Sequence, residues 1–113
     1  MRVQAYLRVL PPGQAGNYGP EAQREDIEQW AALQKDCKII GWRRFPDSGA
    51  PSDREDVDRL VQEAYRLVFA GLLDGAIFGR EERLAPKSPT TRYFQESLEA
   101  EGVQVLFAEV PTA

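Results

Sequence analysis

Three arginines and an aspartate stand near the ends of apolar segments, where their charges could act on one ligand. Arg8 closes the first such segment, Asp47 follows the second with Arg54 shortly after it, and Arg83 follows the third. Guanidinium groups bind phosphate and other oxyanions through paired hydrogen bonds. If the three arginines converge, they form a phosphate or oxyanion site.

A second interpretation of the same residues needs no ligand. Asp47, Glu81 and Glu82 lie in the same loops as the arginines and could neutralise them in an internal network of ion pairs. Hydroxyl groups also occur nearby, but nothing in their sequence context marks one as an activated nucleophile. The sequence leaves both interpretations open.

The composition excludes several other kinds of site. The 113 residues contain no histidine, which removes the commonest general base and the commonest zinc ligand. Cys37 is the single cysteine, so no internal disulfide can form, which is typical of a reducing cytoplasm. No apolar run approaches the ~18 residues of a membrane span, and no signal peptide is visible.

The balance of charge limits how the chain could bind nucleic acid. The net charge is −4 and the isoelectric point is about 4.9. An acidic surface repels nucleic acid at long range, so any phosphate binding has to come from a local arginine cluster.

Strands and helices alternate along the chain. Apolar residues of period two predict a strand over 2–9, and apolar segments predict further strands over 38–45, 72–79 and 103–110. Helical periodicity predicts helices over 20–36, 54–70 and 90–101. Asp53 is a plausible N-cap of the second helix, and the segment REERLAPKSP is expected to be a charged loop.

This alternation predicts an α/β fold. We expect one domain over 1–113, a three-layer α/β/α sandwich with a mostly parallel sheet of about four strands. In such sheets, ligands bind at the loops that follow the carboxyl ends of the strands. Asp47, Glu82 and Arg83 lie in those loops, and Arg8 and Arg54 stand next to them, at the end of a strand and the start of a helix.

The order of these motifs resembles the catalytic domain of the serine recombinases, the resolvase and invertase family. The resemblance covers almost the whole chain and rests on six short motifs in the family's order. They are YLRVL at 6–10, Gln14, EAQRED at 21–26, Asp47 with SG at 48–49 and DR at 53–54, ERLAP at 82–86, and EAEGVQVLFAE at 99–109.

The resemblance implies a mechanism in which a serine attacks a DNA phosphodiester and arginines clamp the phosphate. Such a mechanism needs no histidine, and we expect no metal and no cofactor, which agrees with the composition. This sequence departs from that mechanism. Leu10 occupies the position of the nucleophilic serine, and a leucine has no oxygen with which to attack. Pro86 replaces a clamp arginine, and neighbouring Lys87 lacks the bidentate fork of arginine. Glu82 replaces an aspartate of the family motif.

Other hydroxyls are weak substitutes for the missing serine. Ser48 matches a family serine that is not the nucleophile, and Tyr6 matches a structural position. Ser52 and Ser88 lie in suitable loops but carry no mark of activation. We therefore expect no functional catalytic residue, with Arg8, Asp47, Arg54, Glu82 and Arg83 as the remnant of a site.

The sequence thus predicts a catalytically degenerate recombinase-like domain that acts as a regulatory or partner-binding pseudoenzyme. The expected partners are DNA, a related recombinase protomer or a second copy in a homodimer. We expect no association with a membrane and no C-terminal DNA-binding domain. Two alternatives stay open. One is a residual DNA strand-cleaving recombinase with a substituted nucleophile, and the other is a phosphate- or nucleotide-binding module that uses Arg8, Arg54 and Arg83.

Overall fold

A computed structural model describes residues 1–13, 18–84 and 88–109 of the chain. Gln14, Pro86 and Lys87, which the resemblance singled out, lie outside these residues. None of the helices in the described ranges combines the length and hydrophobicity that crossing a lipid bilayer requires.

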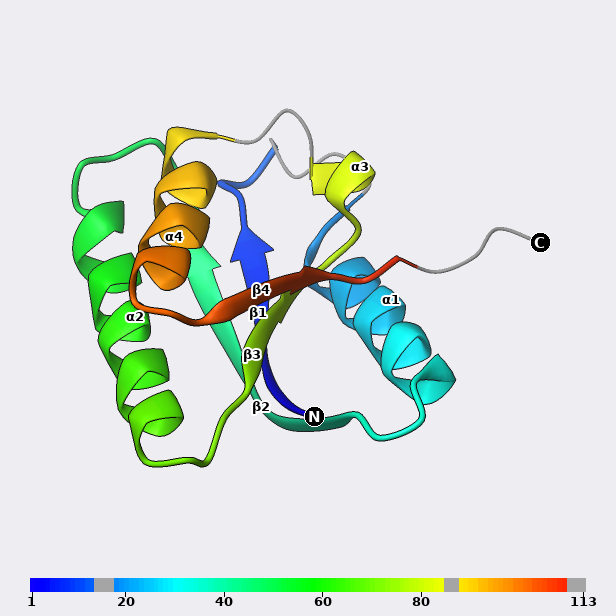
Figure 1. Cartoon of the computed structure of the whole chain (residues 1–113). Helices are drawn as coiled ribbons and strands as arrows, with labels where there is room; N and C mark the ends of the chain where they lie inside the picture. Colours follow the sequence, from blue (N-terminus) through cyan, green and yellow to red (C-terminus); the bar gives the residue numbers. More distant parts are fainter. Residues whose placement is uncertain (14–17, 85–87, 110–113) are drawn as a thin grey trace.

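The centre of the molecule is a parallel sheet (Figure 1). Its four strands have the order β2-β1-β3-β4, and neighbouring strands all pair in parallel. The six residues from Val3 to Arg8 and all of β3 are buried, because helices cover both faces of these central strands. The strands are β1 (Arg2–Val9), β2 (Lys38–Pro46), β3 (Gly75–Phe78) and β4 (Gln104–Phe107).

Helices cover the sheet on two sides, so the predicted three-layer α/β/α sandwich is confirmed. Helix α1 (Pro20–Leu33) lies on one face, and α2 (Asp53–Phe69) and α4 (Pro89–Ala100) lie side by side on the other (Figure 1). The short helix α3 (Glu81–Leu84) lies beyond the carboxyl end of β3.

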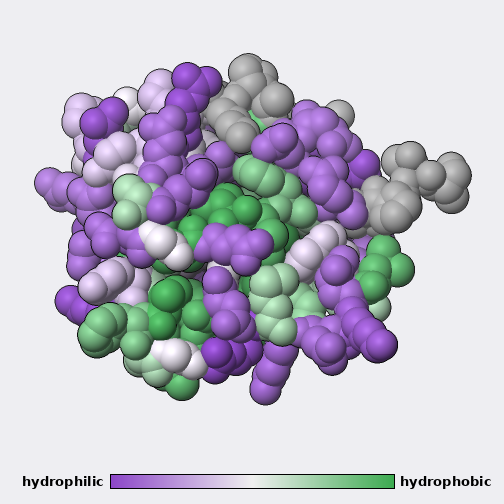
Figure 2. Space-filling view, in the orientation of Figure 1, coloured by the Kyte–Doolittle hydropathy of each residue, from purple (hydrophilic) through white to green (hydrophobic). Residues whose placement is uncertain are grey.

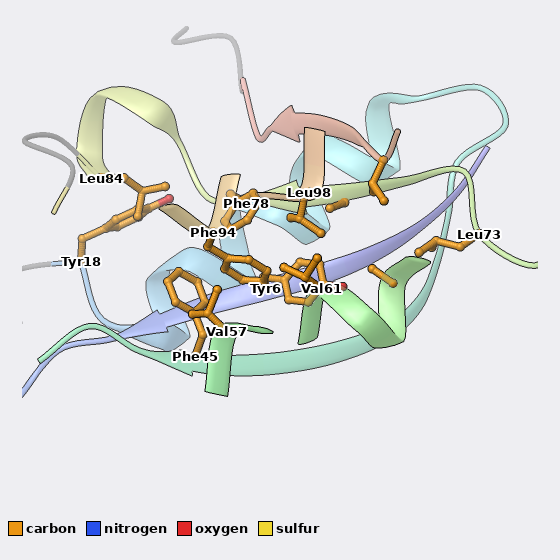
Figure 3. Close-up of a cluster of buried hydrophobic side chains, with 13 residues drawn as sticks. Tyr6, Tyr18, Phe45, Val57, Val61, Leu73, Phe78, Leu84, Phe94 and Leu98 are labelled. Atoms are coloured by element: carbon orange, nitrogen blue, oxygen red, sulfur yellow. The ribbon is translucent and has the colours of Figure 1, made fainter. Parts of the chain in front are cut away.

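The alternation of β1 divides the core into two parts. Val3, Ala5 and Leu7 face α1 and pack with Ile27 and Trp30. The intervening residues face α2 and α4, where four aromatic rings form the centre of the larger cluster (Figure 3). Phe94 contacts the other three edge-on, with ring centroids 4.9–5.5 Å away, an arrangement that aromatic quadrupoles favour. These three rings belong to Tyr6, Phe45 and Phe78.

Two local predictions were wrong. Asp53 is not the N-cap of α2: Ser52 takes that position, and Asp53 begins the helix. The Asp53 carboxylate instead turns back to the preceding loop and accepts hydrogen bonds from the backbone N–H groups of Ser48 and Gly49, at 2.7 and 3.0 Å. The segment expected to be a charged loop contains α3, which begins where the N–H groups of Arg83 and Leu84 donate to the carbonyl of Arg80.

Candidate functional site

The polar residues at the carboxyl edge of the sheet are organised around Arg8. Its side chain is 8% exposed, and its Nη1 donates a hydrogen bond to the Leu84 carbonyl at 2.9 Å. The same nitrogen lies 4.0 Å from Asp47 Oδ2. Burial lowers the pKa of the Arg8 guanidinium below its ordinary value, and the charge of Asp47 opposes that shift. Nη1 of Arg8 is therefore held by groups of the protein itself, whereas its buried Nε has no hydrogen-bond partner among the described residues.

Asp47 joins this arginine to the start of α4. The backbone N–H of Asp47 donates to the Val9 carbonyl at 3.0 Å, which ties the ends of β1 and β2 together. Its carboxylate accepts hydrogen bonds from the Ser88 hydroxyl and, at 2.9 Å, from the Thr91 hydroxyl. Ser88 also caps α4, because its Oγ accepts from the Thr91 N–H at 3.1 Å. Through these hydrogen bonds, the Asp47 carboxylate stabilises the start of α4.

Arg83 belongs to a neighbouring cluster built around Tyr18. Its guanidinium carbon lies 4.1 Å from the centre of the Tyr18 ring, and its Nη1 lies 3.6 Å from Asp26 Oδ2. The Tyr18 hydroxyl donates to Asp26 at 2.9 Å and accepts from the Arg80 N–H at 2.7 Å. Burial raises the pKa of Tyr18, and its hydrogen bond to Asp26 acts in the same direction.

Arg54 lies on the surface beside α4. Its guanidinium carbon is 4.6 Å from the centre of the Tyr93 ring, and the Tyr93 hydroxyl donates to Asp58 at 2.6 Å. Arg54 lines two hollows, of about 300 and 360 Å³, which also share Pro89. Arg92 borders the first of these hollows. No carboxylate within ion-pair distance of Arg54 is found among the described residues.

The structure thus brings Arg8 and Asp47 together, whereas Arg54 and Arg83 each have a different aromatic neighbour. Glu82 does not contact Arg8: its exposed carboxylate lies 2.7 Å from the half-buried guanidinium of Arg80. Leu10 follows β1 directly and is half-buried.

The hydroxyl groups considered as substitute nucleophiles differ in their surroundings. Ser48 donates to Asp53 at 2.8 Å, and Ser88 donates to Asp47. The Tyr6 side chain is fully buried, and that burial raises its pKa to about 12. Ser52 is exposed at the N-cap of α2. Within the described ranges, no group of three His, Cys, Asp or Glu side chains could hold a metal ion.

Four residues organise this edge without having been predicted to do so: Gln23, Tyr18, Asp26 and Thr91. Gln23 lies within the EAQRED motif and is 1% exposed, which shows that the motif supplies a buried polar contact and not only a helix start. Tyr18 lies next to residues outside the described ranges, in a segment that reads as a loop. A buried tyrosine inside such a loop has no periodicity by which to find it.

Comparison with known proteins supports the fold. No family model matches the chain, and no curated protein matches it. Among solved structures, it is similar to the C-terminal catalytic domain of ISC1926 TnpA, an IS607-like serine recombinase. The TM-score is 0.59 at 21% sequence identity, over 100% of this chain and 72% of the other. The architecture is therefore that of a serine-recombinase catalytic domain.

Proposed function

We propose that the chain is a catalytically degenerate serine-recombinase-like domain, which acts in site-specific DNA recombination by binding a partner. The fold is the first support for this proposal. The absence of a hydroxyl at Leu10, the position that resembles the family's nucleophile, is the second. A related recombinase protomer is the proposed partner.

The burial of Arg8 is the observation that carries the proposal. An arginine that stabilises a transferring phosphate has to present its donors to the substrate. Arg8 instead directs Nη1 to the Leu84 carbonyl and toward Asp47, and its side chain is 8% exposed. Such an arrangement stabilises the edge of the sheet and favours a structural role for the remnant site.

Sedimentation velocity tests the partnership. The fluorescently labelled chain is mixed at micromolar concentration with a purified full-length serine recombinase from the same cell. We expect a faster-sedimenting complex, while an unrelated acidic α/β protein of similar size leaves the recombinase unchanged. Absence of association at micromolar concentration contradicts the proposal. A run of the chain alone separately tests the homodimer, which would sediment faster as its concentration rises.

Arg54 favours a second candidate, a phosphate-binding module. Arg54 borders an open hollow together with Arg92 and Glu96, and among the described residues no carboxylate lies within ion-pair distance of Arg54. DNA binding measured by fluorescence anisotropy tests this candidate. Binding that weakens steeply with salt and is lost in Arg54→Ala supports it. Equal behaviour of Arg54→Ala and the control Arg59→Ala, which removes an exposed arginine paired with Asp56, counts against it.

A further inference from the structure

The end of α2 carries a patch of exposed apolar side chains. Phe69 is 82% exposed, Tyr65 is 39% exposed, and Leu72, in the connection from α2 to β3, is 54% exposed. The rings of Tyr65 and Phe69 stack with their centroids 6.1 Å apart, so these two side chains form one surface. Figure 2 shows hydrophobic surface at the lower left, where α2 ends in Figure 1. Apolar side chains gathered in this way are typical of a surface that another molecule covers.

From this patch, exposed residues continue along the outer face of α2 in three rows. Residues seven apart lie on the same side of an α-helix, because seven residues make nearly two turns. The middle row is Glu55, Gln62 and Phe69, with Asp58 and Tyr65 on one side of it and Arg59 and Arg66 on the other. All seven residues are exposed, so the whole face is open to a partner.

The two outer rows differ in charge. One row holds Asp58 and Tyr65, and it lies on the α4 side, where the Asp58 carboxylate accepts a hydrogen bond from the Tyr93 hydroxyl at 2.6 Å. The other row holds Arg59 and Arg66. Within the described ranges, no carboxylate lies within ion-pair distance of Arg66. One row therefore offers an anion and an aromatic ring, and the other offers two cations.

We propose that two copies of the chain bind each other through the outer faces of α2, with the two helices parallel. A twofold axis along the helices places each outer row opposite the other outer row of the second copy, at the same level. Asp58 then faces Arg59 of the second copy, Tyr65 faces Arg66, and the two Phe69 side chains meet near the axis. The inference goes beyond the proposed function, because it concerns two copies of this chain and not its recombinase partner.

These contacts are attractive, which is the reason to assign the face to a second copy. Arg59 is 72% exposed although it pairs with Asp56 on its own helix, so its guanidinium is open to the Asp58 carboxylate of the second copy. A guanidinium is attracted to the face of a tyrosine ring, and each buried aromatic side chain removes on the order of 150 Å² from water. The two Glu55 residues repel each other only weakly, because they lie about 21 Å along the helix from Phe69 and packed helices diverge away from their contact.

The charges also select the direction of the two helices. An antiparallel arrangement would place each outer row opposite the same row of the second copy, with Arg59 beside Arg66. Like charges brought together at a contact are destabilising. The face is therefore self-complementary only when the helices are parallel. Because the patch is small, the dimer is expected to be weak.

Sedimentation equilibrium of the full chain, from about 10 µM to about 1 mM, tests the contact. The natural sequence is compared with Phe69→Ser and with the matched control Leu33→Ser, which changes an apolar side chain on α1 that is 63% exposed. We expect a monomer–dimer equilibrium whose dissociation constant rises about tenfold in Phe69→Ser, because the buried aromatic surface is lost. The dissociation constant is expected to change less than about twofold in Leu33→Ser.

Charge reversals test the direction of the helices. Arg59→Asp places a carboxylate opposite Asp58 of the second copy, and Asp58→Arg places a guanidinium opposite Arg59. Each is expected to weaken the dimer about fivefold, whereas the double variant restores opposite charges and returns the dissociation constant to within about twofold. Lys35→Asp makes the same change of net charge as Arg59→Asp at an exposed position after α1, and is expected to have less than about a twofold effect.

Several results overturn the proposal. A chain that stays monomeric up to about 1 mM does so, as does equal dimerisation of Phe69→Ser and Leu33→Ser, which would place the contact elsewhere on the surface. A tighter dimer in Arg59→Asp would show that the helices are antiparallel. A monomeric chain that binds the full-length recombinase, and loses that binding in Phe69→Ser, would assign the patch to the recombinase instead.

Discussion

Gln23 on α1 binds the backbone of Arg8 on β1 through both ends of its side-chain amide. Its Oε1 accepts from the Arg8 N–H at 2.8 Å, and its Nε2 donates to the Arg8 carbonyl at 2.9 Å. Pairing between β1 and β3 covers only Val3 to Ala5, whereas pairing between β1 and β2 continues to Val9. Gln23 thus takes the place of a neighbouring strand beside Arg8.

Replacement of Gln23 by leucine is expected to destabilise the fold. Gln23→Leu leaves the buried N–H and carbonyl of Arg8 without these partners, which costs about 2–4 kcal/mol of the free energy of unfolding. Urea denaturation measures the change. Gln29→Leu on an exposed position of the same helix is the control and is expected to change stability by less than about 0.5 kcal/mol. Equal effects of the two substitutions would contradict the structural role of Gln23.

Gly79 and Tyr18 are packed too closely for a side chain at Gly79. A Cβ at that position would lie 2.5 Å from the Tyr18 hydroxyl oxygen, so Gly79→Ala has to displace the ring and its hydrogen bonds. We expect a loss of about 1–3 kcal/mol in thermal unfolding. Gly19→Ala is the control: nothing lies within 4 Å of its Cβ, so it is expected to cost only the smaller loss that alanine brings at the N-cap of α1.

A double variant tests the cause of this loss. Tyr18→Phe removes the hydroxyl that a Cβ at Gly79 would meet first. The cost of Gly79→Ala is therefore expected to be smaller in the Tyr18→Phe background than in the natural sequence. An equal cost in both backgrounds would show that the hydroxyl is not the obstacle.

The buried Tyr6 side chain is expected to lower the free energy of unfolding at alkaline pH. Burial raises its pKa from 10.0 to about 12, so the folded state holds the phenol proton that the unfolded state releases at lower pH. The stabilisation is complete below about pH 10 and falls toward pH 12, by about 1.4 kcal/mol per pH unit. Urea denaturation between pH 9 and pH 11.5 measures this slope. The decrease of stability with pH is expected to be shallower in Tyr6→Phe. Tyr65→Phe, which changes an exposed tyrosine, is the control. If neither variant changes the slope, Tyr6 is not the group that causes it.

Arg8 and Asp47 are expected to contribute to stability as a pair. Arg8→Met leaves the Asp47 carboxylate buried without its cation, and Asp47→Asn leaves Arg8 without its anion. A double-mutant cycle in urea is expected to give a coupling energy of about 1–3 kcal/mol. Additive effects of the two substitutions would show that the ion pair contributes nothing to the free energy of unfolding. The phosphate-binding alternative predicts instead that Arg8→Met weakens DNA binding with little loss of stability.

The fold could be predicted from the sequence because the spacing of apolar residues within a segment depends only on neighbouring residues. The alternation of Val3, Ala5 and Leu7 fixes which side chains of β1 face α1, and the apolar stripe of α2 places Val57 and Val61 in the opposite layer. The prediction for Asp53 was wrong because two signals compete there. Its side chain could cap the helix or bind the loop, and only the folded loop presents the Ser48 and Gly49 N–H groups to it.

The arrangement of the site was harder to predict, because it depends on residues far apart in the chain. Strand order indicates that Arg8, Asp47 and Arg83 lie at one edge, but not which partners they find. Arg8 meets the carbonyl of Leu84, and Arg83 meets Tyr18 and Asp26. Every residue has a backbone carbonyl, so the sequence does not indicate which carbonyl a buried arginine will bind.

The most direct test of the account is a recombination assay. A full-length serine recombinase from the same cell is supplied with its DNA site, with and without this chain, and products covalently attached to protein are separated on a denaturing gel. The account predicts that the chain changes the rate of recombination saturably and never appears in a covalent product. An unchanged rate, or DNA attached covalently to this chain, would contradict it.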